Sequence, residues 1–483
     1  MKKRLAVILI IFIIFVPLIP AVVFLTGYSL PAQFDETYYG ELADMYDRLA
    51  TSEKKKIVVV GTSSVAFGVE CAVAEGELAA SGLEDYEVCK FGLYGALGTK
   101  LMMELSRDHI SEGDIVIFMP EFTDQTMSLY FSASDTWRSF DGCFDLFWEL
   151  EAEDMECMVG SYVGFAAEKV GYAFDGKPQG SGVYAHASFD ENADMSNASR
   201  PYNTMSGGYD PDTPIGFDPT LWTDEFVEYV NEYCACIQEA GAEMYFYCTP
   251  MNASAVTDAS KDAVDAFIEY TESVLEFSVL GNPGDCVMEA EWFYDSNFHL
   301  NEYGSVVYTA QLCEDLKSKL GATNPSSIEL PDMPDLPSSE TDEGEGDNTD
   351  ADCFTYEDSD GVYIVTGLTE EGAEKESLTV PYAVNGYVVT SVNADALQND
   401  TVLREIVFQE NITRLRDSMF SGCTSLESIY LQHEDPSDIS VAFNLLDGAP
   451  DDCCIYVPSD SLKLYTSDYF WGHYAANIAG YDL

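Results

Sequence analysis

Residues 55–68 read Lys-Lys-Ile-Val-Val-Val-Gly-Thr-Ser-Ser-Val-Ala-Phe-Gly. The apolar run at 57–60 predicts a short, fully buried strand, of the kind found in parallel sheets. Ser63 follows at the carboxyl end of this strand and would begin a helix. A serine is a poor nucleophile near neutral pH unless a base takes its proton and a carboxylate orients that base. The stretch therefore predicts a fold class and raises the question of where such a base lies.

The pattern around this stretch predicts an α/β domain with a parallel sheet. Between residues 56 and 320, apolar strand-like runs alternate with amphipathic helical runs. Strands are expected at 57–60, 87–91, 115–119 and 244–248, and helices at 72–80, 97–109, 223–240, 258–277 and 302–320. Residues 122–219 lack this periodicity and are rich in aromatics, Gly and Asp. We expect them to be an insertion that shapes a pocket or covers the sheet.

The N-terminus predicts a membrane anchor. Three basic residues at 2–4 precede 23 uncharged residues, 5–27, enough to cross a bilayer as a helix. The basic residues would keep the N-terminus in the cytoplasm. Because no convincing small-residue cleavage site follows, an uncleaved anchor within 1–30 is favoured over a signal peptide. The chain is thus expected to be a single-pass protein of the cell membrane, with its bulk extracytoplasmic at the cell surface.

Charge and cysteine content narrow the classes of partner. The formal net charge is −63, from 85 acidic and 22 basic residues, which argues against nucleic-acid or anionic-lipid binding. Thirteen cysteines, with no Cys-x-x-Cys pair, suggest buried thiols in a reducing or anaerobic habitat. No His/Cys cluster suggests a metal, and no cofactor is expected.

A second domain follows an acidic, Pro-rich linker at 326–352. Residues 330–352 hold nine acidic and no basic residues, so that segment cannot bury enough apolar surface to fold. Beyond it, residues 389–408 match residues 412–431 after a shift of 23 positions, within the range of leucine-rich repeats. Residues 353–457 resemble the BspA-like leucine-rich repeats of bacterial surface proteins. We therefore expect a small β-solenoid-like domain at 353–483, closed by a C-terminal aromatic cap.

The candidate base emerges by elimination. Of five histidines, three precede the linker: His109, His186 and His299. His109 follows an amphipathic run, where it would meet the negative end of a helix dipole, and His186 lies in a region without periodicity. His299 remains, with Asp295 four residues before it as the candidate carboxylate.

Three blocks, in order, resemble the SGNH (GDSL-like) hydrolase superfamily. They are Gly-Thr-Ser-Ser at 61–64, Phe-Gly-Leu-Tyr-Gly-Ala-Leu-Gly at 91–98, and Asp-Ser-Asn-Phe-His at 295–299. The resemblance implies a three-layer α/β/α domain over 31–325, with Ser63 as nucleophile, His299 as base and Asp295 as its orienter. It also implies an oxyanion hole formed by the backbone amides of Ser63 and Gly95, where a glycine would let the backbone approach the substrate closely.

The chain departs from that pattern at three places. Thr62 stands where Asp is usual, and Asp295 precedes His299 by four residues where three is commoner. Glu121 follows the third strand, where the superfamily normally supplies an oxyanion-stabilising Asn. An ionised Glu121 would repel a developing negative charge, so it would have to be protonated, turned away, or engaged with a substrate hydroxyl.

Glu121, Asn252 and Tyr94 are the candidate substrate contacts. Asn252 follows the fourth strand at the edge where ligands of α/β proteins bind, and Tyr94 adjoins Gly95. The simpler alternatives stay open: Glu121 as a solvated loop residue, Tyr94 as a packing residue, Ser63 and Asp295 as helix caps, and His299 as a residue that only bonds to backbone.

Two functions follow from these observations. The first is a membrane-anchored extracytoplasmic serine esterase or O-acyltransferase acting on acyl groups of cell-envelope or host glycans. A looser resemblance to the membrane-anchored DltD-like and alginate-acetylation-like branch points to envelope polymers. The alternative is a surface adhesion protein whose repeats bind a protein or glycan partner, and whose SGNH-like domain is non-catalytic.

Overall fold

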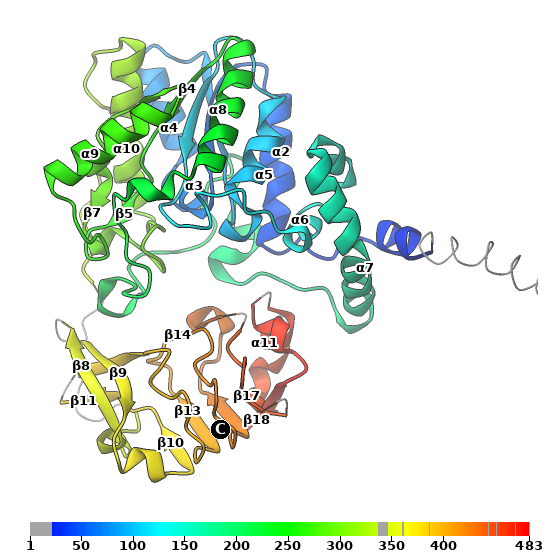
Figure 1. The fold of residues 1–483 in the computed structure, drawn as a ribbon, viewed down its shortest axis with the longest axis vertical. Helices are drawn as coiled ribbons and strands as arrows, with labels where there is room; N and C mark the ends of the chain where they lie inside the picture. The colour runs from blue at the N-terminus through cyan, green and yellow to red at the C-terminus, as the bar shows by residue number, and fades with distance from the viewer. Residues whose placement is uncertain are drawn as a thin grey trace, which may run out of the picture.

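The computed structural model describes residues 22–336 and 346–482, except 360, 361, 386, 443, 451 and 469. Figure 1 shows two bodies, an α/β domain and a smaller domain made largely of β-strands. The predicted anchor at 1–30 therefore lies mostly outside the described residues, as does the middle of the linker. Within the described part, no helix has both the length and the apolar character needed to cross a membrane.

A five-stranded parallel sheet forms the centre of the first domain, as the alternating pattern predicted. Its order is β2-β1-β3-β4-β6. The strands are β1 (Lys55–Gly61), β2 (Tyr86–Phe91), β3 (Ile115–Met119), β4 (Glu243–Phe246) and β6 (Ser278–Val279). The chain runs from β1 to β2 on one side and then returns to β3 on the other. The carboxyl ends of β1 and β3 are thus a topological switch point, where open α/β sheets bind ligands.

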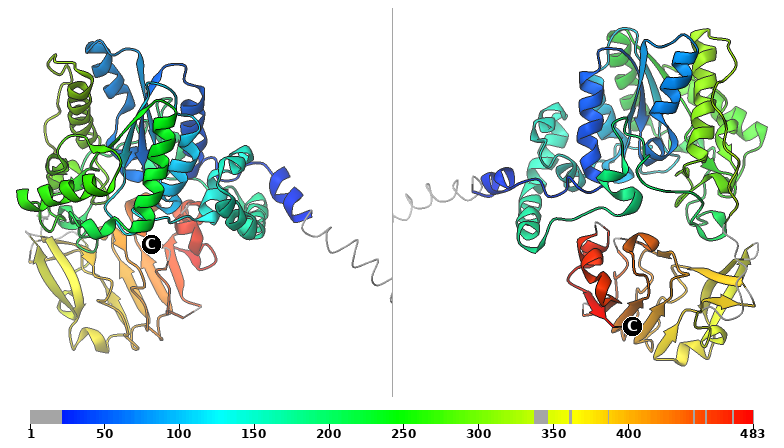
Figure 2. Two further views of the ribbon diagram at one scale, coloured as in Figure 1. Left: turned by 45° about the horizontal axis from the view of Figure 1, so that its top comes forward. Right: turned by 180° about the vertical axis from the view of Figure 1, so that it is seen from behind.

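Helices pack on both faces of this sheet (Figures 1 and 2). One group is α2 (Glu41–Thr51), α5 (Thr99–Arg107) and α8 (Asp224–Glu239), and another is α3 (Ser63–Gly68), α4 (Cys71–Ala80) and α10 (Gly304–Leu320). A further helix, α9 (Lys261–Val274), packs beside β6. The five predicted helices are present, whereas α2 was not foreseen. The thirteen cysteines are free thiols and most are buried.

The insertion at 122–219 is more helical than its sequence suggested. It contains α6 (Ala133–Ser139), a 3-10 turn at Phe144–Glu149, and α7 (Ala152–Asp175), which is 24 residues long. The helix α7 escaped prediction because its outward face is also largely apolar, so that the 3.6-residue alternation is weak. Residues 176–219 follow with only short 3-10 turns.

The second body is a parallel stack of strands. Its main sheet has the order β10-β13-β15-β17-β18, with β10 (Ser377–Thr379), β13 (Glu405–Phe408), β15 (Ser428–Leu431), β17 (Cys454–Pro458) and β18 (Ile478–Tyr481). Ile406 lies opposite Ile429, the offset of 23 residues that the repeat predicted. The aromatic tail contributes buried Tyr465 and Trp471 to the same core. Membership in the leucine-rich-repeat family stays a prediction.

Smaller strands complete this body. A four-stranded sheet comprises β8 (Phe354–Ser359), β9 (Val362–Leu368), β11 (Ala383–Val384) and β12 (Tyr387–Val392), and a two-stranded one pairs β14 (Arg414–Leu415) with β16 (Ser440–Val441). Helix α11 (Leu462–Ser467) lies near the C-terminus. In the first domain, β5 (Met251–Asn252) pairs with β7 (Val287–Met288).

Ion pairs join the two bodies. Arg414 contacts Asp210 at 2.6 Å, and Arg416 contacts both Asp210 and Asp212. On the other side, the Gln179 amide donates to the Ser467 carbonyl at 2.8 Å. The second body is therefore held against residues 179–213, the irregular end of the insertion.

Candidate active site

Ser63 is the first residue of α3 and lies at the carboxyl end of β1. It is 7% exposed. This position follows from the sequence locally: a buried apolar strand ends at Gly61, and a helix starts two residues later. The hydroxyl is thus at the switch point of the sheet, beside the amide groups of a helix N-terminus.

Glu121 occupies the space in front of these donors. It follows β3, and its Oε1 accepts both the Ser63 hydroxyl at 3.0 Å and the Ser64 amide at 2.9 Å. Glu121 is 8% exposed, so it is buried rather than a solvated loop residue. One carboxylate oxygen therefore stands where backbone amides would stabilise an oxyanion.

Asp295 and His299 form an oriented pair. His299 Nδ1 lies 2.7 Å from Asp295 Oδ1, and the Tyr184 hydroxyl donates to Asp295 Oδ2. Burial alone would raise the pKa of Asp295, but the charge and hydrogen bond of His299, the Tyr184 hydroxyl and the Arg414 charge outweigh it and lower the pKa. An ionised Asp295 fixes the proton on Nδ1 and leaves Nε2 as the basic nitrogen. Within the described residues, Nε2 has no hydrogen-bond partner.

Phe67 links His299 to the serine. The imidazole stacks flat on the Phe67 ring, with centroids 4.0 Å apart and planes at 4°. Phe67 and Ser63 are four residues apart on α3, hence on the same helix face. No hydrogen bond between Ser63 and His299 is present among the described residues, because the Ser63 hydroxyl points to Glu121. The structure thus brings all three candidate residues together, with the serine turned toward a different carboxylate.

A cleft of about 1690 Å³ opens over these residues and is lined by both bodies. Ser63, Asp295 and His299 form part of its first-domain wall, and Arg414 and Phe470 contribute from the second body. Tyr94 lines the cleft as well and also packs edge-on against Phe470, at 6.4 Å between ring centroids. Tyr94 is therefore both a packing residue and a wall of the site.

The space in front of Gly95 is open, and its role as an oxyanion donor that a substrate approaches closely stays a prediction. A side chain at Gly95 would meet open space, and its carbonyl accepts from Gln125 at 2.9 Å. The constrained glycine of this block is Gly92, where a Cβ would lie 2.8 Å from both the Gly61 carbon and the Thr62 oxygen. Gly92 lets the ends of β1 and β2 come together behind Ser63.

Asn252 is built into the protein interior. It is fully buried, its amide nitrogen donates to the Gly208 carbonyl at 2.8 Å, and its side-chain oxygen accepts from the Ser254 amide at 3.0 Å. Both ends of the side chain are therefore used to brace a loop. The next residues, Ala253 and Ser254, line the cleft instead.

Sequence reasoning missed Asn297, which lies inside the block that contains Asp295 and His299. The buried Asn297 donates to the carbonyls of Asp210 and Thr213 and accepts from the Asp210 amide at 2.8 Å. Asp210 in turn pairs with Arg414 of the second body. Position within the block could have marked Asn297 as important, but no sequence signal identified its partners. Tyr184 had no signal at all.

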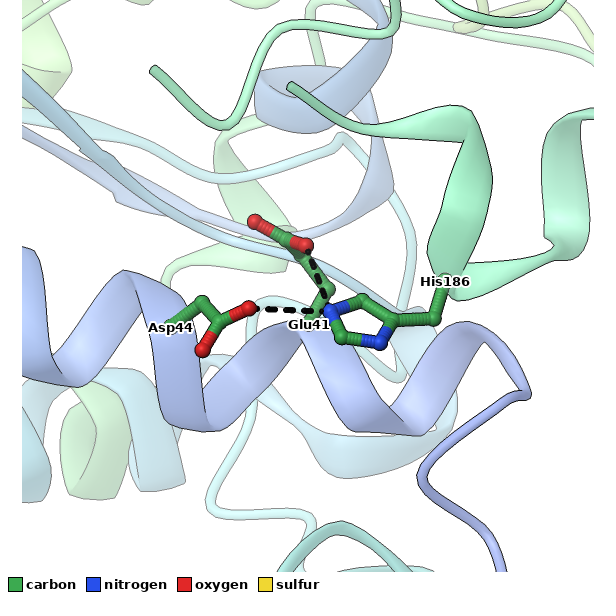
Figure 3. A group of neighbouring side chains, drawn as sticks. All are labelled: Glu41, Asp44 and His186. Atoms are coloured by element: carbon green, nitrogen blue, oxygen red, sulfur yellow. Dashed lines mark hydrogen bonds and ion pairs between the residues drawn. The ribbon is translucent and has the colours of Figure 1, made fainter. Parts of the chain in front are cut away.

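His186 lies in a separate cluster with Glu41 and Asp44 (Figure 3). Its Nε2 is 3.4 Å from Glu41 and 2.9 Å from Asp44. The hydrogen bond to Glu41, and then that to Asp44, raise the pKa of His186 to about 9 against the effect of burial. The protonated His186 ring therefore pairs with two carboxylates of α2 and links this helix to the segment that contains Tyr184.

Comparison with known proteins identifies no relative: no family model matches the chain, and no curated protein matches its sequence. The chemistry of the cleft must therefore be inferred from its own residues. Among these, the oriented imidazole, the buried serine and the intruding carboxylate are the three features that any function has to accommodate.

Proposed function

We propose that this protein is a membrane-anchored, extracytoplasmic serine esterase or O-acyltransferase of the SGNH type. The observation that carries the proposal is that Ser63, at the switch point of the sheet, shares a cleft with an imidazole oriented by Asp295. A buried serine at a helix start is common, but here a carboxylate-oriented histidine stacks on Phe67, which lies one helical turn from Ser63 on α3. A serine and an oriented histidine in one cleft are what nucleophilic catalysis needs.

The reaction begins with attack by Ser63 Oγ on the carbonyl carbon of an ester. His299 Nε2 takes the serine proton, and the resulting imidazolium gives it to the departing alcohol as the ester C–O bond breaks. Water or a sugar hydroxyl then attacks the acyl-Ser63, passing its proton to His299, and the proton returns to Ser63 as the serine is released. Asp295 stays ionised throughout and stabilises the imidazolium.

Glu121 controls whether this series of reaction steps can begin. Glu121 Oε1 accepts from the Ser64 amide, beside the Ser63 amide that is expected to hold the developing oxyanion, so its charge would repel that oxyanion. Glu121 must therefore withdraw or become protonated when the substrate carbonyl enters, and the Ser63 hydroxyl must turn from Glu121 to His299. In this proposal, the arrangement in which the Ser63 hydroxyl donates to Glu121 is the resting state of the site.

The wall of the cleft supports a glycan substrate. Tyrosines supply flat, amphipathic surfaces of the kind on which sugar rings stack, and several line the cleft, namely Tyr94, Tyr184, Tyr202, Tyr209 and Tyr294. The cleft runs between two bodies, so it suits a chain longer than a simple ester. Acyl groups on cell-envelope or host glycans are the proposed substrates.

A fluorophosphonate probe tests the proposal, because it reacts with serines that are activated as nucleophiles. Wild-type protein should be labelled, and Ser63→Ala should not. Ser64→Ala is the matched control, since Ser64 is fully buried and its hydroxyl has no hydrogen-bond partner among the residues that the structure describes. Absence of Ser63-dependent labelling at every pH from about 5 to 9 would refute the enzyme.

The contact between Ser63 and Glu121 favours one alternative, a surface binding protein. If Glu121 never leaves, the domain is a non-catalytic support and the repeats bind a protein or glycan partner. In that case Ser63→Ala protein would bind envelope or host glycans as tightly as wild type, and neither would react with the probe. Labelling of Ser63 together with release of an acyl group would exclude this alternative.

A further inference from the structure

The outward face of α7 carries no charge over most of its length. The exposed residues between positions 157 and 174 are Cys157, Val159, Gly160, Val163, Gly164, Ala167, Ala173 and Phe174. Val159 is 65% exposed, Val163 63% and Phe174 86%. In a chain with 85 acidic residues, a helix face of this length without an exposed carboxylate is a marked exception.

Internal packing does not account for this face. The opposite side of α7 supplies the buried contacts, including Tyr162 and Phe165, which pack against Trp137. On the outer side, a side chain added at Gly160 or Gly164 would meet open space. Within the described chain, the outer face of α7 is thus uncovered.

The segment that leads to the N-terminal apolar run packs against α7 on its buried side, next to the exposed apolar residues of the outer face. The Tyr162 hydroxyl donates to the Phe24 carbonyl at 2.9 Å, and Lys169 Nζ donates to the Leu30 carbonyl at 3.0 Å. Figures 1 and 2 show residues 22–29 next to α7, projecting from the domain. More than half of each of four apolar side chains in this segment is exposed, namely Val22, Phe24, Leu25 and Tyr28.

We propose that the outer face of α7 lies in the interfacial region of a lipid bilayer, at the point where residues 5–27 enter it. Residues 5–27 are an uncharged apolar run of 23 residues, and the described end of this run contacts α7 through Tyr162 while its own apolar side chains stay exposed. A helix that lies in the membrane plane buries its apolar side to about 5–10 Å. This contact would fix the orientation of the cleft relative to the bilayer surface. The proposal does not depend on whether Ser63 is catalytic.

The net negative charge of the protein indicates which lipid headgroups this contact can tolerate. The rest of the molecule is strongly acidic and would be repelled by anionic headgroups. The contact therefore depends on apolar insertion and should form on zwitterionic phosphatidylcholine.

The test uses the full-length chain in phosphatidylcholine vesicles whose acyl chains carry bromine near the headgroup, which quenches tryptophan on contact. A reporter is introduced by Val163→Trp, with Leu464→Trp on α11 as the matched control, because Leu464 is also 52% exposed. We expect the emission added at position 163 to fall by roughly half or more in brominated vesicles, since interfacial helices reach the bromine depth. The emission added at position 464 should not change.

Two results would overturn the proposal. One is unquenched emission from position 163, or equal quenching at both positions. The other is efficient disulfide cross-linking of exposed Cys157 between two copies in the vesicles, which would assign the face to a second molecule. Adding Val159→Asp to the reporter chain should abolish quenching while the protein still floats with the vesicles, and persistent quenching would contradict the inference.

Discussion

Ser63, Glu121 and His299 define the chemistry of the cleft at the scale of single residues. Glu121 accepts hydrogen bonds from the Ser63 hydroxyl and the Ser64 amide, and His299 is oriented by Asp295 without a hydrogen bond to Ser63. The sequence predicted that Glu121 would conflict with catalysis, yet it could not say where the carboxylate would point. That depends on the distance between the ends of β1 and β3.

Replacing Glu121 by Asn should raise activity. Glu121→Asn removes the repelling charge and supplies an amide donor, so kcat/KM on a small aryl ester should rise about a hundredfold, the lower end of the effect of one oxyanion-hole donor. Glu121→Ala removes only the charge and should give a smaller gain. Initial rates of the two variants decide the matter. A folded Glu121→Asn variant with less activity than wild type would mean that Glu121 itself assists the reaction.

His186 should contribute pH-dependent stability. Its pKa in the folded state, about 9, lies above the ordinary 6.5, so its contribution is complete below pH 6.5 and disappears as pH rises to 9. Because the side chain is partly exposed, we expect only about 1 kcal/mol. His186→Gln should lower the melting temperature at pH 6 and leave it unchanged at pH 10. An equal change in melting temperature at both pH values would contradict a stabilising ion pair between His186 and the two carboxylates.

At the scale of elements, β1, the short helix α3 and the glycine after β2 form one unit. Gly92 permits the close approach of backbone at Gly61 and Thr62, while Phe67 on α3 supports the His299 ring. The apolar strand and the helix start were readable from residues 55–68. The stacking of His299 on Phe67 was not, since it joins positions more than 230 residues apart.

Gly92→Ala and Gly95→Ala form a matched pair. The new methyl group at Gly92 would collide with backbone atoms, so we expect a loss of about 1–3 kcal/mol in unfolding free energy. At Gly95 the methyl group meets open space, and stability should stay within about 0.5 kcal/mol of wild type. Denaturant titration of both variants provides the measurement. A larger loss at position 95 than at position 92 would contradict this assignment of the constrained glycine.

At the scale of the whole molecule, the second body closes the cleft. Arg414 and Arg416 hold Asp210, and their charges lower the pKa of Asp210 although burial would raise it. This part of the interface is therefore present above pH 3.8 and is lost as the pH falls through the lowered value. Phe470 adds an aromatic contact with Tyr184, at 5.5 Å between ring centroids.

The double variant Arg414→Ala, Arg416→Ala should loosen the two bodies. The amide of Gln179, which donates across the interface to Ser467, is the reporter. Its hydrogen exchange should become about tenfold faster or more, equivalent to a loss of about 1.4 kcal/mol. Arg404→Ala is the control, because Arg404 pairs with Glu427 within the second body. Unchanged exchange at Gln179 in the double variant would show that these ion pairs do not hold the interface.

The sequence by itself determined what depends on neighbours along the chain. The parallel sheet, five of the helices, the 23-residue offset between stacked strands and the pairing of Asp295 with His299 all follow from local periodicity and short spacing. Only the tertiary structure decided which carboxylate meets Ser63, that Tyr184 supports the Asp295–His299 pair, and which body closes the cleft. Those contacts join distant segments such as 121, 184 and 414, and their formation depends on packing in three dimensions that no local pattern encodes.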